Sequence, residues 1–280
     1  MSFAYLLLLV WGTGIPTLED SLSPVSLTTV DVVSHGWGDV SPKEVEKILL
    51  SVVSCMEKST GVCVGENLRV EPSGGPVVLF KRDPDGSYRI RLNVSGRYWS
   101  QLIYQFSHEF GHVIARYKPD PGPQAWLEEA ICEAMSFQVL KKLSVAWRNR
   151  PPFESLRNYA PHLSDYSILM SSRCVSVEPR DMAKWFSNHK TRLQVSRHDR
   201  ELIRSFSRVF SKWLEEHPRL WALVPKLGRG QSTNEESICD RIDRWISPEN
   251  PEEKEFADLL KNTLLGVPVQ TESGSSKNQP

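Results

Sequence analysis

The sequence lacks an excess of charge of either sign. Its 280 residues include 34 Lys and Arg against 34 Asp and Glu, so the formal net charge is zero. A protein that binds nucleic acid through the phosphate backbone usually carries a basic excess. An acidic, disordered protein carries the opposite excess. The balance argues against both classes, and no nucleic-acid partner is expected.

Long hydrophobic runs are also missing. A membrane-spanning helix needs about 20 consecutive apolar residues, and no run in this chain is that long, so no stable membrane span is expected. Residues 1–14 contain a shorter apolar run that fits the middle of a signal peptide, but no Lys or Arg precedes it and no A-x-A site follows. With a signal peptide the protein would be periplasmic or secreted; with a buried first strand instead, it would be cytoplasmic.

Cysteine occurs only 5 times, and no two cysteines form a C-x-x-C pair. A cysteine-based zinc site is therefore not expected. Cys55 and Cys63 are close enough in sequence for a disulfide in an exported protein. Buried free thiols are the favoured alternative.

The first part of the chain predicts strands and one capped helix. Residues 27–33 are rich in β-branched side chains and predict a strand. The run Ser41-Pro42-Lys43-Glu44 is typical of a capping box and begins a helix over 42–57. Short strands are expected at 68–70 and 77–80. Apolar and polar residues alternate over 88–94, which predicts a half-buried strand, one that could lie at an exposed sheet edge.

The rest of the chain predicts helices. Helical spacing of apolar residues indicates helices at 100–117 and 124–143, and no strand alternation is seen from Pro151 onward. Further helices are expected at 178–188, 202–214, 218–227, 233–246 and 251–265. The expected fold class is α+β: an α/β lobe with a small mixed sheet over 25–118, an all-helical lobe over 119–267, and a disordered tail over 268–280.

One motif in the helix at 100–117 points to metal chemistry. His108-Glu109-Phe110-Gly111-His112 has the pattern H-E-x-x-H, and histidines at i and i+4 lie on one helix face. Both imidazoles can then reach one metal ion, while Glu109 can act on a metal-bound water. A catalytic zinc normally has three protein ligands, and no third histidine follows closely. The nearest candidates are the carboxylates of Glu128, Glu129 and Glu133 in the next helix.

HEFGH followed by WLEEA resembles the gluzincin metallopeptidases, such as thermolysin and the aminopeptidase-like families. The resemblance covers roughly residues 100–138 and implies a zincin-like N-terminal lobe and a Zn²⁺ cofactor. It makes Glu129, preceded by a polar residue and followed by a small one, the third ligand. Glu133 would brace His108. The gap from His112 to Glu129 is a few residues shorter than in those families, so Glu133 remains the second choice as ligand and Glu128 the third.

The resemblance implies a zinc-dependent metallopeptidase acting on a peptide or protein, with Glu109 as general base. It also implies that the strand at 88–94 binds an extended peptide by β-addition, with Arg89, Arg91 and Asn93 as substrate-binding residues. An oxyanion-stabilising Tyr or His is expected from the helical half, and the candidates are Tyr159, His162, Tyr166, His189 and His198. The alternative is a catalytically inactive zincin-like scaffold that binds peptides or partner proteins; the presence of Glu109 favours the enzyme.

Overall fold

The computed structural model describes residues 27–116, 118, 122–196, 198–246 and 249–266. The expected signal peptide at 1–14 and the expected tail at 268–280 lie outside these residues. None of the described helices combines the length and the apolar character needed to cross a bilayer.

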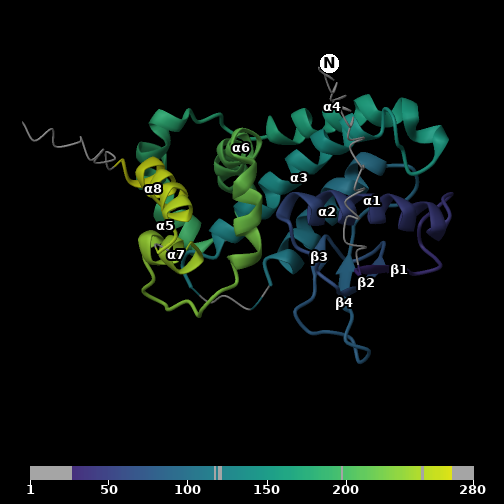
Figure 1. Cartoon of the computed structure of the whole chain (residues 1–280), viewed down its shortest axis with the longest axis horizontal. Helices are drawn as coiled ribbons and strands as arrows, with labels where there is room; N and C mark the ends of the chain where they lie inside the picture. Colours follow the sequence, from purple (N-terminus) through teal and green to yellow (C-terminus); the bar gives the residue numbers. More distant parts are fainter. Residues whose placement is uncertain (1–26, 117, 119–121, 197, 247–248, 267–280) are drawn as a thin grey trace, which may run out of the picture.

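The chain has a mixed α/β fold with a small four-stranded mixed sheet in the order β1-β2-β4-β3 (Figure 1). Strands β1 (Thr29–Val32), β2 (Asn67–Glu71) and β4 (Tyr88–Arg91) are parallel, while β3 (Val77–Val78) is antiparallel to β4. Helix α1 (Pro42–Thr60) connects β1 to β2. It begins at the expected capping box: the Ser41 side chain accepts from Glu44 N–H, and the Glu44 carboxylate accepts from Ser41 N–H.

The expectation that residues 88–94 lie at a sheet edge is wrong. Strand β4 is hydrogen-bonded to β2 on one side and to β3 on the other. The turn closed by Gly86 N–H donating to the Asp83 carbonyl folds the chain back, so that the backbone N–H of Leu79 donates to the carbonyl of Arg89. The period-two pattern therefore reports one buried and one polar sheet face. Addition of a peptide strand to β4 is excluded, and β3 forms the edge on this side.

After Arg91 the described residues form helices and no further strand. Helices α2 (Trp99–Ile114) and α3 (Trp126–Ala146) match the expected helices closely. The remaining elements are η1 (Glu154–Tyr159), α4 (Ala160–Ser171), η2 (Pro179–Asp181), α5 (Met182–Val195), α6 (Arg200–Glu216), η3 (Pro218–Lys226), α7 (Ile238–Trp245) and α8 (Pro251–Leu265).

Several of these elements differ from the expectation. Element η1 was not expected, and the helix expected at 178–188 is the 3-10 helix η2 followed by α5, which ends at Val195. Helix α4 was missed, because its apolar residues lie on both faces: Leu163 is buried while Ile168 and Leu169 are exposed. The segment after Pro218 is a 3-10 helix with a second proline inside it. Helix α7 begins later than expected, because Ser237 caps it.

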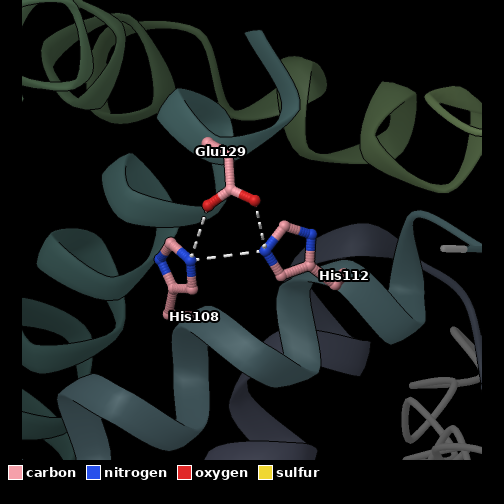
Figure 2. A group of neighbouring side chains, drawn as sticks. All are labelled: His108, His112 and Glu129. Atoms are coloured by element: carbon pink, nitrogen blue, oxygen red, sulfur yellow. Dashed lines mark hydrogen bonds and ion pairs between the residues drawn. The ribbon is translucent and has the colours of Figure 1, made fainter. Parts of the chain in front are cut away.

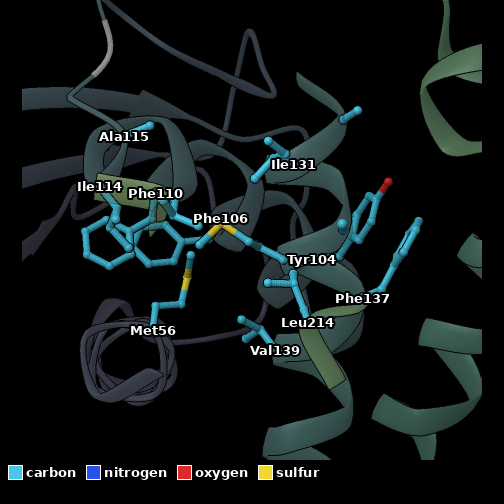
Figure 3. Packing of buried hydrophobic residues seen from close by; sticks show 14 of the residues in the cluster. Met56, Tyr104, Phe106, Phe110, Ile114, Ala115, Ile131, Phe137, Val139 and Leu214 are labelled. Atoms are coloured by element: carbon cyan, nitrogen blue, oxygen red, sulfur yellow. The ribbon is translucent and has the colours of Figure 1, made fainter. Parts of the chain in front are cut away.

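One hydrophobic cluster runs through both halves of the chain, from Val30 in β1 to Leu264 in α8. Helix α2 lies at its centre, between α1 and α3, and α6 packs against the far side of α3 (Figure 1). Figure 3 shows Phe106 and Phe110 of α2 between Met56 of α1 and Ile131 of α3. These two phenylalanine rings are stacked with centroids 5.7 Å apart. The α/β part and the helical part therefore share their core.

Helices α2 and α3 approach most closely at Gly111. A β-carbon at this position would lie 3.1 Å from Sγ and 3.3 Å from Cβ of Cys132. Both distances are tight for a carbon contact, so the absence of a side chain permits this helix–helix distance. The glycine inside the H-E-x-x-H motif thus has a packing role: it lets α3 lie against the histidine-bearing face of α2.

We expect Gly111→Val to lower the free energy of unfolding by about 1–3 kcal/mol, because the added methyl groups overlap Cys132. Urea denaturation measures the change. The matched background is Cys132→Ala, which removes the sulfur, and there the same substitution should cost less. Equal penalties in the two backgrounds would show that this contact does not set the helix spacing.

Candidate metal centre

Three side chains from two helices converge in the centre of the protein (Figure 2). His108 and His112 stand one turn apart on α2, with their Nε2 atoms 3.3 Å apart. The Glu129 carboxylate of α3 lies between them, 3.3 Å from Nε2 of His108 and 3.6 Å from Nε2 of His112. The three ligand atoms all lie within 4.8 Å of one another. This group could hold a metal ion.

Two more carboxylates of α3 hold the opposite sides of the imidazole rings. Nδ1 of His108 lies 3.4 Å from Glu133 Oε2, and Nδ1 of His112 lies 2.9 Å from Glu128 Oε1. A carboxylate that accepts from Nδ1–H fixes the tautomer and points Nε2 away from itself, which is the usual support of a metal-bound histidine. The structure thus places Glu129 on the ligand side and the other two glutamates behind the rings.

The bracing role of Glu128 was missed by sequence analysis, which regarded it only as a less favoured ligand. Glu128 lies about 100° around the helix from Glu129, and this offset carries its carboxylate past the metal position to the far side of His112. Both Glu128 and Glu133 are buried. The glutamates of α3 therefore do not form a solvated helix face.

Arginines from distant helices neutralise the bracing carboxylates. Arg204 Nε of α6 donates to Glu133 at 2.8 Å, 71 residues along the chain. Tyr104 also donates its hydroxyl to Glu133, and Arg204 reaches the same hydroxyl oxygen. Arg241 of α7, only 1% exposed, lies 3.7 Å from Glu128. Tyr104 could have been found from sequence, because it precedes His108 by four residues on the same helix face; the arginines could not.

The protonation of the metal-free site follows from these contacts. Burial lowers the pKa of His108, but its hydrogen bonds to Glu129 and Glu133 outweigh burial and hold the pKa well above the ordinary value. Burial likewise lowers the pKa of His112, and its neighbours Cys132 and Glu129 raise it well above the ordinary value. Burial raises the pKa of Glu129, but the two imidazoles lower it more strongly. These contacts thus favour the protonated form of both imidazoles and the ionised form of the Glu129 carboxylate.

Glu109 lies beside this group, and burial has the larger effect on its pKa. Its side chain is buried and its pKa is raised, because burial outweighs the opposing effect of the two histidines. Its Oε2 accepts a hydrogen bond of 2.7 Å from the backbone N–H of Val78 in β3. A carboxylate with a raised pKa takes up a proton more readily than an ordinary one. The bond to Val78 ties this candidate base to the edge strand.

A cleft of about 540 Å³ opens onto the three ligand residues. The segment 75–78, which includes β3, lines one wall together with Asn93, Gln101 and Gln105, and the opposite wall comes from α4 and α6. Of the expected substrate-binding residues, only Asn93 is in the lining. Arg89 pairs with Asp83 at 2.8 Å, and Arg91 pairs with Glu71 at 2.7 Å, both away from the cleft.

Two of the five oxyanion candidates reach the cleft. Tyr166 and His198 are in its lining, and Nδ1 of His198 lies 3.9 Å from Glu129 Oε1. The others are placed elsewhere: the Tyr159 hydroxyl accepts from Ser100, His162 packs against the Tyr159 ring, and His189 Nδ1 contacts the Trp185 carbonyl.

All five cysteines lie within the described residues and are free thiols. The disulfide considered between Cys55 and Cys63 is therefore not formed. Cys63 is exposed, and its sulfur accepts a hydrogen bond from the backbone N–H of Leu27. No cysteine belongs to the metal-ligating group found among the described residues.

Comparisons with protein-family models, with curated proteins and with solved structures find no match to this chain.

The separate positions of Glu129 and Glu133 predict different losses of metal affinity. Glu129→Ala removes a ligand atom, whereas Glu133→Ala removes only the group behind His108, which typically costs 10–100-fold. We expect the loss to be larger for Glu129→Ala when Zn²⁺ is titrated against a competing chelator. Glu46→Ala on α1 is the control and should leave the affinity unchanged. A larger loss in Glu133→Ala would exchange the two roles.

Metal affinity should also depend steeply on pH. Both imidazoles have raised pKa values in the metal-free protein, and a metal must displace their protons. The protonated form persists below the raised pKa and disappears as the pH rises through it. Affinity should therefore fall on acidification from a higher pH than an ordinary histidine pKa would give, by up to about two decades per pH unit. Zn²⁺ titrations from about pH 6 to about pH 9 test this. A pH-independent affinity would contradict it.

Proposed function

We propose that the protein is a zinc-dependent metallopeptidase of gluzincin type. The main support for the proposal is that both nitrogens of each imidazole have a carboxylate partner. Each Nε2 faces the Glu129 carboxylate, and each Nδ1 faces a bracing carboxylate on α3. Two histidines placed on a buried helix by chance would not be expected to have a buried carboxylate at each Nδ1.

The donor set supports zinc over a harder cation. Two imidazole nitrogens and one carboxylate are a known ligand set of catalytic zinc, which leaves a position open for water or substrate. Magnesium and calcium prefer all-oxygen surroundings. Zinc bound here would lower the pKa of its water to about 7 and polarise the scissile carbonyl.

The chain's own residues supply the remaining functions. Glu109, with its raised pKa, would accept the proton of the attacking water and deliver it to the leaving amine. Its hydrogen bond to Val78 holds the carboxylate toward the cleft. His198 lines the cleft and lies 3.9 Å from the ligand carboxylate, so we assign it the stabilisation of the developing oxyanion, with Tyr166 also in the lining.

The edge strand β3 replaces β4 as the segment that would align a peptide. It borders the cleft through Val77 and Val78, and it pairs with β4 on only one side. An extended substrate along this short strand would place its scissile bond near Glu109. The backbone N–H of Val78 is already bonded to Glu109, so alignment would depend on the other polar groups of this wall.

The decisive test compares Glu109→Gln with wild type. Both proteins should bind one Zn²⁺ per chain, because Glu109 is not a ligand, and hydrolysis of a mixed peptide library should fall by about 10²–10⁴-fold in the variant. Glu46→Gln on α1, which touches neither cleft nor metal group, is the matched control and should retain activity. Zinc content is measured by atomic spectroscopy and cleavage by mass spectrometry.

Two negative results of this experiment would lead to different conclusions. Zinc without cleavage of any peptide by wild type would favour the scaffold that binds peptides without hydrolysing them. The absence of zinc from both proteins would remove the metal site itself.

A further inference from the structure

The side of the cleft formed by α4 and α6 carries two arginines that form no ion pair with any carboxylate of the described residues. Arg173, just after α4, and Arg200, the first residue of α6, both line the cleft and are exposed. Neither side chain has a carboxylate oxygen within 4.0 Å among the described residues. The third arginine of the cleft lining, Arg204, is paired with Glu133.

The acidic groups of the cleft are already engaged. Its lining contains three glutamates: Glu129 faces both imidazoles, Glu133 is held by His108 and Arg204, and Glu109 accepts from Val78 N–H. A bound divalent cation would add further positive charge. The loaded cleft therefore has an excess of positive charge next to Arg173 and Arg200.

Nearby acids on α6 do not compensate Arg200. Asp199 is paired with Arg192 at 2.5 Å, and Glu201 lies 4.0 Å from the same arginine. The positive end of the α6 dipole is located here as well, since Arg200 is its first residue. The opposite wall is neutral, with Asn93, Gln101 and Gln105. The charge is thus confined to one side of the cleft.

We propose that this side binds a carboxylate of the substrate, so that the protein acts on peptides bearing either an acidic side chain or a free C-terminus near the scissile bond. This inference rests on the proposed peptidase function and names its substrate class. Arginine suits the role, because its planar guanidinium donates two parallel hydrogen bonds to a carboxylate. Two unpaired arginines at one wall would hold one carboxylate or one at each of two positions.

The test measures binding separately from cleavage. Three fluorescent peptides of equal length are titrated into Zn²⁺-loaded Glu109→Gln protein and followed by anisotropy: one neutral with both ends blocked, one with a single Glu moved along the sequence, and one neutral with a free C-terminus. We expect at least one charged peptide to bind about tenfold more tightly than the neutral one, with the advantage shrinking at high salt. The peptide that gains identifies the source of the carboxylate.

The arginines are tested in the same background. Arg173→Gln combined with Arg200→Gln should remove most of the advantage, while the Lys pair at these positions should keep part of it, because the charge remains but the fork is lost. Arg208→Gln is the matched control: it lies on α6, is exposed, and is not in the cleft lining. Circular dichroism and cooperative unfolding verify that each variant is folded.

Three results would overturn the inference: equal affinity for charged and neutral peptides, no binding of any of them, or an advantage that survives in the Gln pair. The proposed function is decided independently by wild-type cleavage of the peptide library. Cleavage without charge preference would leave the peptidase standing and remove the substrate class. Charge-selective binding without cleavage would keep the recognition and remove the peptidase.

Discussion

The contact between the acidic face of α3 and the two imidazoles of α2 is the constraint on which the centre of this protein depends. Five ionisable side chains, His108, His112, Glu128, Glu129 and Glu133, are brought largely out of water there. Desolvation costs several kcal/mol per charge unless each group is paired. The arrangement is therefore tolerable only if every carboxylate meets an imidazole, and that requires α2 and α3 to pack at one distance and one rotation. Gly111 against Cys132 sets the distance.

The same pairing ties the helical half of the chain to the candidate metal centre. Arg204 from α6 lies against Glu133, and Arg241 from α7 lies against Glu128. These arginines are themselves buried or nearly so, and they would be costly without their partners. The positions of α6 and α7 are thus coupled to the orientation of His108 and His112. Helix α6 also carries Arg200 and forms part of the cleft wall, so the proposed metal site and the proposed substrate-binding wall share one framework.

Most of the elements were predictable because they are governed by local rules. The capping box at Ser41 and Glu44, the turn at Gly86 and the helical spacing of α2, α3 and α6 depend only on residues within a few positions of one another. Helix α4 was not predicted, because Ile168 and Leu169 lie on its exposed side and blur the apolar pattern. Tertiary packing decides which side is buried. The sheet edge was misplaced for a related reason: alternation in β4 reports which face is buried and says nothing about which strand lies beside it.

Residue spacing along the chain establishes which ionisable groups share a helix: two histidines and a glutamate on one turn of α2, and three glutamates within two turns of α3. Helical periodicity relates such residues directly, which is why Tyr104 was also within reach of sequence reasoning. Which imidazole nitrogen each glutamate faces depends on tertiary packing, because the rotation of α3 against α2 follows from contacts over the whole shared core. The tertiary structure alone brought Arg204, Arg241, Arg173 and Arg200 to the site, since no local pattern relates residues so distant in the chain.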